Sequence, residues 1–257
     1  GLLYIETENR GPQEIAFAEA IAFIAGLAME AKELAGELER TIYELARLQA
    51  VKEQEELEKD YIRALFSRFV SPQVVEKLAS DPSILRLGGV RQEITILFAD
   101  IRGFTALSEK LPPEDLVKTL NQYLSIAADA IMEEEGTLDK FLGDAVMAFF
   151  NAPFPQEQHV LKGARTALKI KKKLEELHAR NVLPLRLYFG IGLNVGEAVI
   201  GNIGTPMQMN YTAIGDCVNV AKRLQEMAKP GQILISSAVY ERIKDKALVR
   251  TLPPTSI

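Results

Sequence analysis

The stretch EITILFADIRGFTALSEK, residues 93–110, begins as an apolar run, ends that run on a carboxylate and then changes character. Its first seven residues, 93–99, predict a buried strand. Such a strand places Asp100 at its exposed end, directly before an Arg-Gly-Phe-Thr turn. A second acidic turn later in the chain gives this placement a chemical reason.

That second turn lies in KFLGDAVMAFF, residues 140–150. The segments TLDKFL and AVMAFF predict two short strands, and Gly143-Asp144 between them predicts a hairpin. Helices are predicted from about residue 113 to 135 and from roughly 157 to 180, on either side of this hairpin. The later segments LRLYFGIGLN and EAVIGNI predict another hairpin, around Val195-Gly196.

The resulting order of strand, helix, strand, strand, helix and strand predicts an α+β fold with the split β-α-β sheet of ferredoxin-like or palm-like domains. Right-handed crossover makes the first two strands parallel, with the third strand antiparallel between them. Asp100 and Asp144 then lie at the same edge of the sheet. Two carboxylates there suit a hard cation such as Mg²⁺ or Mn²⁺. The alternative is that each is an ordinary polar strand end.

The turn after Asp100 favours a phosphate ligand. Gly103 lets backbone N–H groups approach a ligand closely, and Thr105 is predicted to start a helix whose positive end favours phosphate. A cation beside phosphate-facing amides indicates a nucleoside triphosphate or another polyphosphate. The chain has no GxxxxGK[ST] loop, and no helix is expected after the glycines of GIGLNVGEAVIGNIG, which excludes P-loop and Rossmann sites.

The composition excludes several other classes of protein. The 257 residues are 47% hydrophobic and 25% charged, which supports a globular core, and the net charge of -5 makes nucleic acid an unexpected partner. One cysteine and two histidines rule out a disulfide framework and a structural zinc site, and fit a reducing cytoplasm. The longest apolar run, residues 20–29, is too short to cross a membrane.

The N-terminal part predicts a signalling segment. Residues 1–12 contain one isolated strand, GLLYIETE, and residues 13–70 predict a long helix with coiled-coil spacing. The apolar spacing falters between Lys52 and Glu55. A single amphipathic helix lying on its own domain is the alternative. Residues 71–90 predict a short helix, with Ser71 as its cap, and a connector. The predicted a and d positions are Phe17, Ala20, Ile24, Leu27, Ala31, Leu34, Leu38, Thr41, Leu45 and Leu48.

Several motifs resemble one family in order and over about residues 90–250. These motifs, which include VRQEITILFADIRGFTALSEK, LNQYL, GTLDKFLGDAVMAFFNAP, GIGLNVGEAVIGNIG and MNYTAIGDCVNVAKRLQ, resemble the catalytic domain of bacterial class III adenylate cyclases. The resemblance implies a catalytic domain over 91–257. A family lysine in a late hairpin has no counterpart before Ile257, so the C-terminal end is expected to be truncated. GLLYIETE and the helix after it look like the end of a GAF sensor domain.

The resemblance also implies roles for individual residues. Two Mg²⁺ or Mn²⁺ ions per site would be bound by Asp100, Ile101 and Asp144. Lys140 would donate to adenine N1, where a guanylate cyclase is expected to have Glu. The substrate would also contact Gly103, Phe104, Thr105 and Thr212, and the catalytic pair would be Asn219 and Arg223.

Thr212 stands where many relatives have Asp. Its hydroxyl can both donate and accept, which predicts a less strict reading of adenine. Among similar cyclases, Thr at this position goes with a response to bicarbonate, which we state as a hypothesis. Arg223 lies four residues after Asn219 and therefore on the same helix face, whereas its neighbour Lys222 is expected to be a solvated charge.

The spacing within the hairpin favours a dimer. Four extended residues, from Lys140 to Asp144, span only about 13 Å, although adenine and the metals lie at opposite ends of one nucleotide. Cyclases of this type share each site between two subunits, so the resemblance implies a homodimer that converts ATP to cyclic AMP and is regulated through its coiled coil. A guanylate cyclase, a polymerase-like nucleotidyl transferase and a catalytically weak signalling module remain alternatives.

Overall fold

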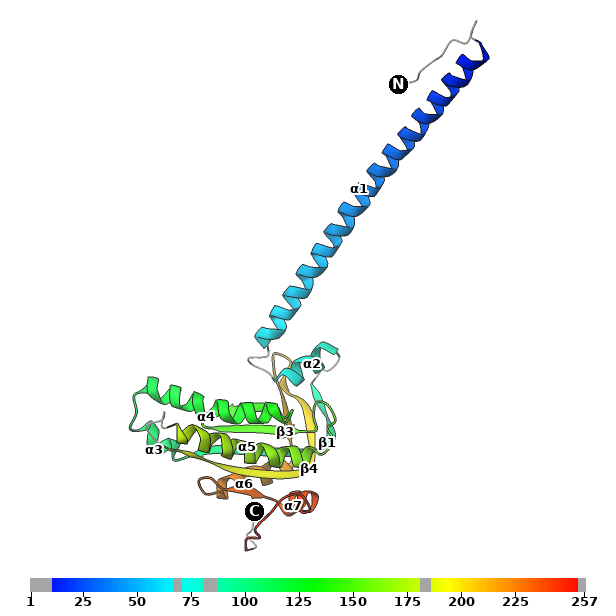
Figure 1. Cartoon of the computed structure of the whole chain (residues 1–257). Helices are drawn as coiled ribbons and strands as arrows, with labels where there is room; N and C mark the ends of the chain where they lie inside the picture. Colours follow the sequence, from blue (N-terminus) through cyan, green and yellow to red (C-terminus); the bar gives the residue numbers. More distant parts are fainter. Residues whose placement is uncertain (1–10, 67–70, 81–86, 181–185, 254–257) are drawn as a thin grey trace. The chain divides into compact units, whose positions relative to one another are not determined.

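The computed structural model describes residues 11–66, 71–80, 87–180 and 186–253 (Figure 1). The chain divides into two compact units, residues 1–64 and 65–257. The strand predicted in GLLYIETE lies outside the described residues. Within the described ranges, no helix is both long enough and apolar enough to cross a membrane.

The first unit is built on one unbroken helix, α1 (Pro12–Phe66). The helix continues through the segment Lys52 to Glu55, where the apolar spacing falters. Large apolar side chains at the predicted a and d positions are uncovered in the single chain, with Phe17, Leu34 and Leu48 exposed at 69, 72 and 65%. An apolar stripe of this length without a cover is typical of a helix that pairs with another helix.

The second unit contains a mixed sheet with helices on both faces. Its strands are ordered β2-β3-β1-β4-β5, and the short β6 pairs with β4. The elements are α2 (Pro72–Ser80), β1 (Gly88–Arg102), α3 (Phe104–Ser108), α4 (Pro113–Glu133), β2 (Thr137–Leu142), β3 (Ala145–Phe150), α5 (His159–Ala179), β4 (Tyr188–Thr205), β5 (Gln208–Ile214), α6 (Asp216–Met227), β6 (Ile233–Ile235) and α7 (Ser237–Ile243).

The predicted split β-α-β arrangement is confirmed. β3 lies between β1 and β2 and is antiparallel to both, so β1 and β2 run parallel with one strand between them. The pairing of β1 with β3 sets Asp100 opposite Ala145 and Thr95 opposite Phe150. Because β2 and β3 are joined by the Gly143-Asp144 turn, this pairing brings the second acidic turn to the end of β1.

The hairpin predicted around Val195-Gly196 is wrong. β4 is a single strand of 18 residues that pairs with the whole length of β1, and Gly196 lies opposite Ile94 within it. β1 is itself longer than predicted, at 15 residues. The hairpin after β4 instead turns at Pro206-Met207, where Thr205 pairs with Gln208. The glycines that suggested a turn are packing positions, as the next contacts show.

Glycines in β4 let helix α6 lie directly against the strand. A Cβ added at Gly192 would be 2.3 Å from both the carbonyl oxygen of Ala221 and the amide nitrogen of Gln225. A Cβ at Gly196 would be 2.9 Å from the Cβ of Cys217. Only glycine allows this approach, which brings the inward face of α6 to the sheet edge that contains Asp100.

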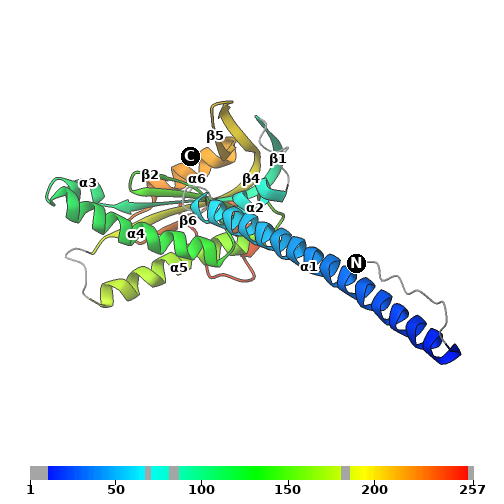
Figure 2. The same cartoon turned by 90° about the horizontal axis from the view of Figure 1, so that it is seen from above.

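Both faces of the sheet are buried (Figure 2). α4, α5 and α7 cover one face, where Leu97, Ile101 and Phe150 belong to the core. α6 and β5 cover the other, where Ile96, Phe98 and Phe149 are buried. The apolar run at 93–99 is continuous because neighbouring side chains point into two different cores.

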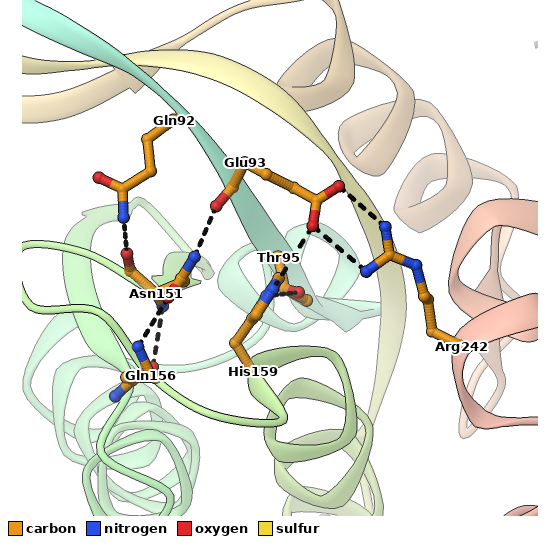
Figure 3. Close-up of polar contacts among 7 residues, drawn as sticks. All are labelled: Gln92, Glu93, Thr95, Asn151, Gln156, His159 and Arg242. Atoms are coloured by element: carbon orange, nitrogen blue, oxygen red, sulfur yellow. Dashed lines mark hydrogen bonds and ion pairs between the residues drawn. The ribbon is translucent and has the colours of Figure 1, made fainter.

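A polar network fixes β1 near its middle (Figure 3). The Glu93 carboxylate accepts from Arg242 Nη1 and Nη2 at 3.3 and 3.0 Å, and its backbone carbonyl accepts from Asn151 Nδ2 at 2.9 Å. Thr95 Oγ1 lies 2.8 Å from His159 Nδ1. The contacts to Asn151 and His159 tie β1 to the segment after β3, and so help to fix the pairing that sets Asp100 beside Asp144.

Gly192→Ala is expected to lower the free energy of unfolding of the second unit by about 1–3 kcal/mol, because the added methyl group meets backbone atoms of α6 that have no room to move. Urea denaturation followed by circular dichroism measures this change. Gly36→Ala is the control, since its Cβ would meet nothing within 4 Å and it lies in α1. Equal stability of Gly192→Ala and the wild type would contradict this account of the packing.

Candidate active site

Asp100 and Asp144 meet at one edge of the sheet. The amide of Ile101 donates to the carbonyl oxygen of Asp144 at 3.2 Å, which continues the β1–β3 pairing into the turn. Burial raises the pKa of the Asp144 carboxyl above its ordinary value, and the neighbouring Asp100 carboxylate raises it further. The structure therefore brings the two carboxylates close enough for their negative charges to repel each other.

Positive and polar groups from two elements surround these acids. Arg102 Nη1 donates to Asp100 Oδ2 at 3.4 Å, and Gln225 Nε2 donates to the same oxygen at 2.8 Å. Gln225 is fully buried, and Lys222 counteracts the rise in the pKa of Asp144. Lys222 is partly exposed, at 37% of its side chain, and its Nζ lies 5.7 Å from the centre of the Phe98 ring, so it is not the purely solvated charge that was expected.

The donor set fits a hard divalent cation. Two carboxylates supply oxygen ligands, and a cation between them would relieve the repulsion that raises the pKa of Asp144. In the part of the chain that the structure describes, no group of three or more His, Cys, Asp or Glu side chains is arranged to hold a metal ion. A cation here would complete its coordination with backbone oxygen, substrate phosphate or water.

A second cluster joins Lys140, Thr212 and Asp139. The Thr212 hydroxyl donates to Asp139 Oδ2, and Lys140 Nζ lies 3.3 Å from Asp139 Oδ1. The Asp139 side chain is only 1% exposed. β2 and β5 are the two ends of the strand order, so the curl of β5 over the sheet makes this contact.

The sequence analysis did not identify Asp139. The pairing of β2 with β3 shifts between Leu138 and Lys140, which marks a bulge at Asp139. A bulge re-aims the side chain of the extra residue, and here it turns a carboxylate inward. The only signal in the sequence was an acidic residue directly before Lys140 in the short strand TLDKFL.

Asn219 and Arg223 are exposed on the outward face of α6. The opposite face, with Ala221 and Gln225, packs on the sheet and contacts Asp100. Among the described residues, no hydrogen bond or ion pair joins Asn219 or Arg223 to Asp100 or Asp144. One chain thus places its predicted catalytic pair and its two acids on different sides of the same helix.

The turn after Asp100 differs in one detail from the prediction. α3 begins at Phe104 with Gly103 at its N-cap, so Thr105 does not start the helix. Gly103 has φ 85°, a left-handed conformation that favours glycine. Leu107 is buried in the core and fixes this short helix to the domain. Gly103, Phe104 and Thr105 thus directly follow the strand that contains Asp100.

Sequence comparison places these features in a known family. A family model described as "Adenylate and Guanylate cyclase catalytic domain" matches residues 89–252. Adenylate cyclase 1 of Rhizobium meliloti is 35% identical over 193 residues, which cover 73% of this chain and 29% of that protein. A terminal-differentiation specific adenylate cyclase of Dictyostelium discoideum is 31% identical over 76% of this chain and 9% of that protein.

Solved structures show the same fold. The adenylyl cyclase CyaB from P. aeruginosa is 37% identical, with a TM-score of 0.60, over 62% of this chain and 84% of that one. The guanylyl cyclase Cya2 is 38% identical, with a TM-score of 0.62, over 66% of this chain and 89% of that one. One of these structures is named as an adenylyl cyclase and the other as a guanylyl cyclase.

The fold and the matched residues define a nucleotide cyclase domain. The chain belongs to the adenylate and guanylate cyclase catalytic domain family. It spans less than a third of the length of the two curated relatives described above.

Asp144→Asn is expected to raise the melting temperature by a few degrees when divalent cations are removed with a chelator. The pKa of Asp144 is raised in the folded chain, so ionisation of this carboxyl costs more in the folded than in the unfolded state at neutral pH. The amide removes that cost, and about 1 kcal/mol corresponds to a few degrees in a domain of this size.

The same measurement with Mn²⁺ should give the opposite difference between the wild type and Asp144→Asn. Mn²⁺ should raise the melting temperature of the wild type more than that of Asp144→Asn, because the variant lacks one carboxylate ligand. Asp115→Asn, an exposed acid on α4 that lies 4.0 Å from Lys118, is the matched control and should follow the wild type. A lower melting temperature for Asp144→Asn in chelator would refute the repulsion between the acids.

Proposed function

We propose that this chain is an adenylate cyclase, which converts ATP to 3',5'-cyclic AMP and pyrophosphate in a homodimer with shared sites. The observation that supports this most is the separation within one chain of two half-sites. One half holds the acids Asp100 and Asp144. The other consists of Lys140 and Thr212, which meet at Asp139, together with Asn219 and Arg223, which are exposed on the outward face of α6. Two copies would complete both sites.

Uncovered apolar side chains lie on β2 and on the β4–β5 hairpin, the elements that contain Lys140 and Thr212. Phe141 and Leu142 follow Lys140 on β2 and are exposed at 47 and 44%, and Met207 and Ile214 on the β4–β5 hairpin are exposed at 95 and 53%. Apolar groups gathered around an incomplete site are typical of a surface that binds another subunit. A second copy of this chain supplies the missing acids, so it is the partner we propose.

In the proposed site, Asp100, Asp144 and the Ile101 carbonyl would hold two Mg²⁺ or Mn²⁺ ions. When bound, such ions lower the pKa of the ribose 3'-hydroxyl and neutralise charge on the pyrophosphate. Asn219 of the partner subunit would orient the ribose, and Arg223 of the partner subunit would stabilise the charge that develops on the α-phosphate. Gly103, Phe104 and Thr105 would lie along the phosphates.

Adenine is the base that these groups fit. Lys140 has only donors, so it suits the N1 acceptor of adenine and not the N1–H of guanine. The similarity to a guanylyl cyclase makes GTP the second candidate. All six family positions are present, which argues against a degenerate signalling module. Response to bicarbonate gains no support from the contacts of Thr212 and stays a prediction.

Purified protein with ATP and Mn²⁺ is expected to form cyclic AMP, and GTP is expected to give far less cyclic GMP. Asp144→Ala and Arg223→Ala should each lower turnover by about 10²–10³-fold or more, because each removes a group that acts on transition-state charge. Chromatographic separation of the cyclic nucleotides measures both. Cyclic GMP as the main product would instead favour the guanylate cyclase.

Mixing the two inactive variants tests the sharing of sites. Random pairing makes half of the dimers mixed, and each mixed dimer has one intact site, so roughly a quarter of the wild-type rate should return. Asp144→Ala mixed with itself is the control and stays inactive. No recovery, although the mixed dimers form, would refute the shared site.

The exposed stripe of α1 would pair the two chains and set how their cyclase domains face each other. Inserting two residues between Lys52 and Glu55 shifts the heptad spacing after that point and should change the cyclase rate. Inserting seven residues at the same place preserves the spacing and is the control. Equal rates for the wild type and both insertions would count against a regulatory role of the helix.

A further inference from the structure

Asp139 joins the two groups that we propose to read the purine. Its carboxylate is buried in the bulge of β2, with Lys140 Nζ 3.3 Å from Oδ1 and the Thr212 hydroxyl on Oδ2. The backbone N–H of Ala213 also donates to this carboxylate. A single buried acid therefore contacts both reading side chains, although these belong to different strands.

The contacts fix the direction of one hydrogen bond. Burial raises the pKa of the Asp139 carboxyl, and Thr212, Lys140 and Ala213 oppose this rise because their donors stabilise the ionised form. The Thr212 hydroxyl donates its one proton to Asp139 Oδ2, and the ion pair with Lys140 favours the ionised carboxylate, which has acceptors only. The hydroxyl then has only lone pairs left for a ligand.

This direction matters for the choice of base. Adenine presents an acceptor at N1 and a donor at its 6-amino group, whereas guanine presents a donor at N1 and an acceptor at O6. Lys140 as donor and Thr212 as acceptor complement adenine at both positions and guanine at neither. The sequence-based expectation that a threonine hydroxyl reads adenine loosely therefore does not hold for a hydroxyl whose proton is already engaged.

We propose that Asp139 is a specificity-determining positioning residue: by accepting a hydrogen bond from the Thr212 hydroxyl, it makes Thr212 and Lys140 select adenine nucleotides over guanine nucleotides. This inference rests on the proposed placement of the purine at Lys140 and Thr212. Asp139 itself touches no substrate. Replacing its carboxylate by an amide lets the Thr212 hydroxyl turn and donate to guanine O6.

Binding of 3'-deoxy-ATP and 3'-deoxy-GTP with Mn²⁺ tests the proposal, because neither nucleotide has the hydroxyl needed for cyclisation. Isothermal titration calorimetry gives the ratio of the two dissociation constants for the full chain. The wild type should favour 3'-deoxy-ATP. Asp139→Asn should lower that preference by about tenfold or more, since it removes the imposed direction of one buried hydrogen bond. Asp115→Asn on α4 is the matched control and should keep the wild-type preference.

Variants of Thr212 separate this role from a merely structural one. Thr212→Ser keeps the hydroxyl and should keep the preference, whereas Thr212→Val should lose it. Asp139→Asn combined with Thr212→Val should be no worse than either alone, because both act through the same hydroxyl. If Asp139→Asn does not fold, the comparison of Thr212→Ser with Thr212→Val decides the matter, and equal preferences would overturn the proposal.

The outcomes distinguish this inference from the proposed function. An unchanged preference in folded Asp139→Asn, or additive losses in the double variant, would overturn the role of Asp139. A wild type that binds both nucleotides equally would overturn it too. A wild type that prefers 3'-deoxy-ATP but forms no cyclic AMP would refute the proposed activity and leave the role of Asp139 standing.

Discussion

The pairing of β1 with β3 is the constraint on which the rest of the site depends. Asp100 opposes Ala145, so the turn that contains Asp144 lies at the end of β1. A slip of one residue would turn Asp100 to the other face of the sheet and separate the acids. Two buried cores and the contacts of Asn151 with β1 oppose such a slip. The fold thereby keeps together two carboxylates that repel each other. Functional sites often retain such locally unfavourable interactions.

Helix α6 extends this constraint to the remaining groups. Gly192 lets the helix lie against β4, and the closeness of that contact allows Gln225 to reach Asp100. The face of α6 that packs on the sheet therefore contacts the acids of its own chain. Asn219 and Arg223 are exposed on the outward face, where they would act on a neighbouring chain in the proposed dimer. One helix thus connects two half-sites, and the glycine beneath it determines its distance from both.

Sequence alone predicted the elements whose signals are local. The apolar run at 93–99, the Gly143-Asp144 turn and the two flanking helices gave the order β2-β3-β1 correctly. The prediction failed where tertiary contact decides the role of a residue. Glycines in β4 were interpreted as turn residues because the helix that needs their space lies elsewhere in the chain. Asp139 was missed because a bulge changes the side-chain alternation. The expectation of a solvated Lys222 holds only in part, because the packing of α6 brings its partly exposed side chain to Phe98.

Lys140 and Thr212, which we propose to contact the purine, illustrate why the chemistry of a side chain depends on its neighbours. A threonine hydroxyl is both donor and acceptor in isolation, and nothing in MNYTAIGD restricts it. A buried carboxylate from β2, 73 residues earlier in the chain, engages its proton and leaves it an acceptor. In the proposed site, the preference for adenine would follow from the contact between β5 and β2 that brings Thr212 to Asp139. A hydroxyl paired in this way can present the same acceptor that an aspartate presents in many relatives, so the two residue types can perform one task through different hydrogen bonds.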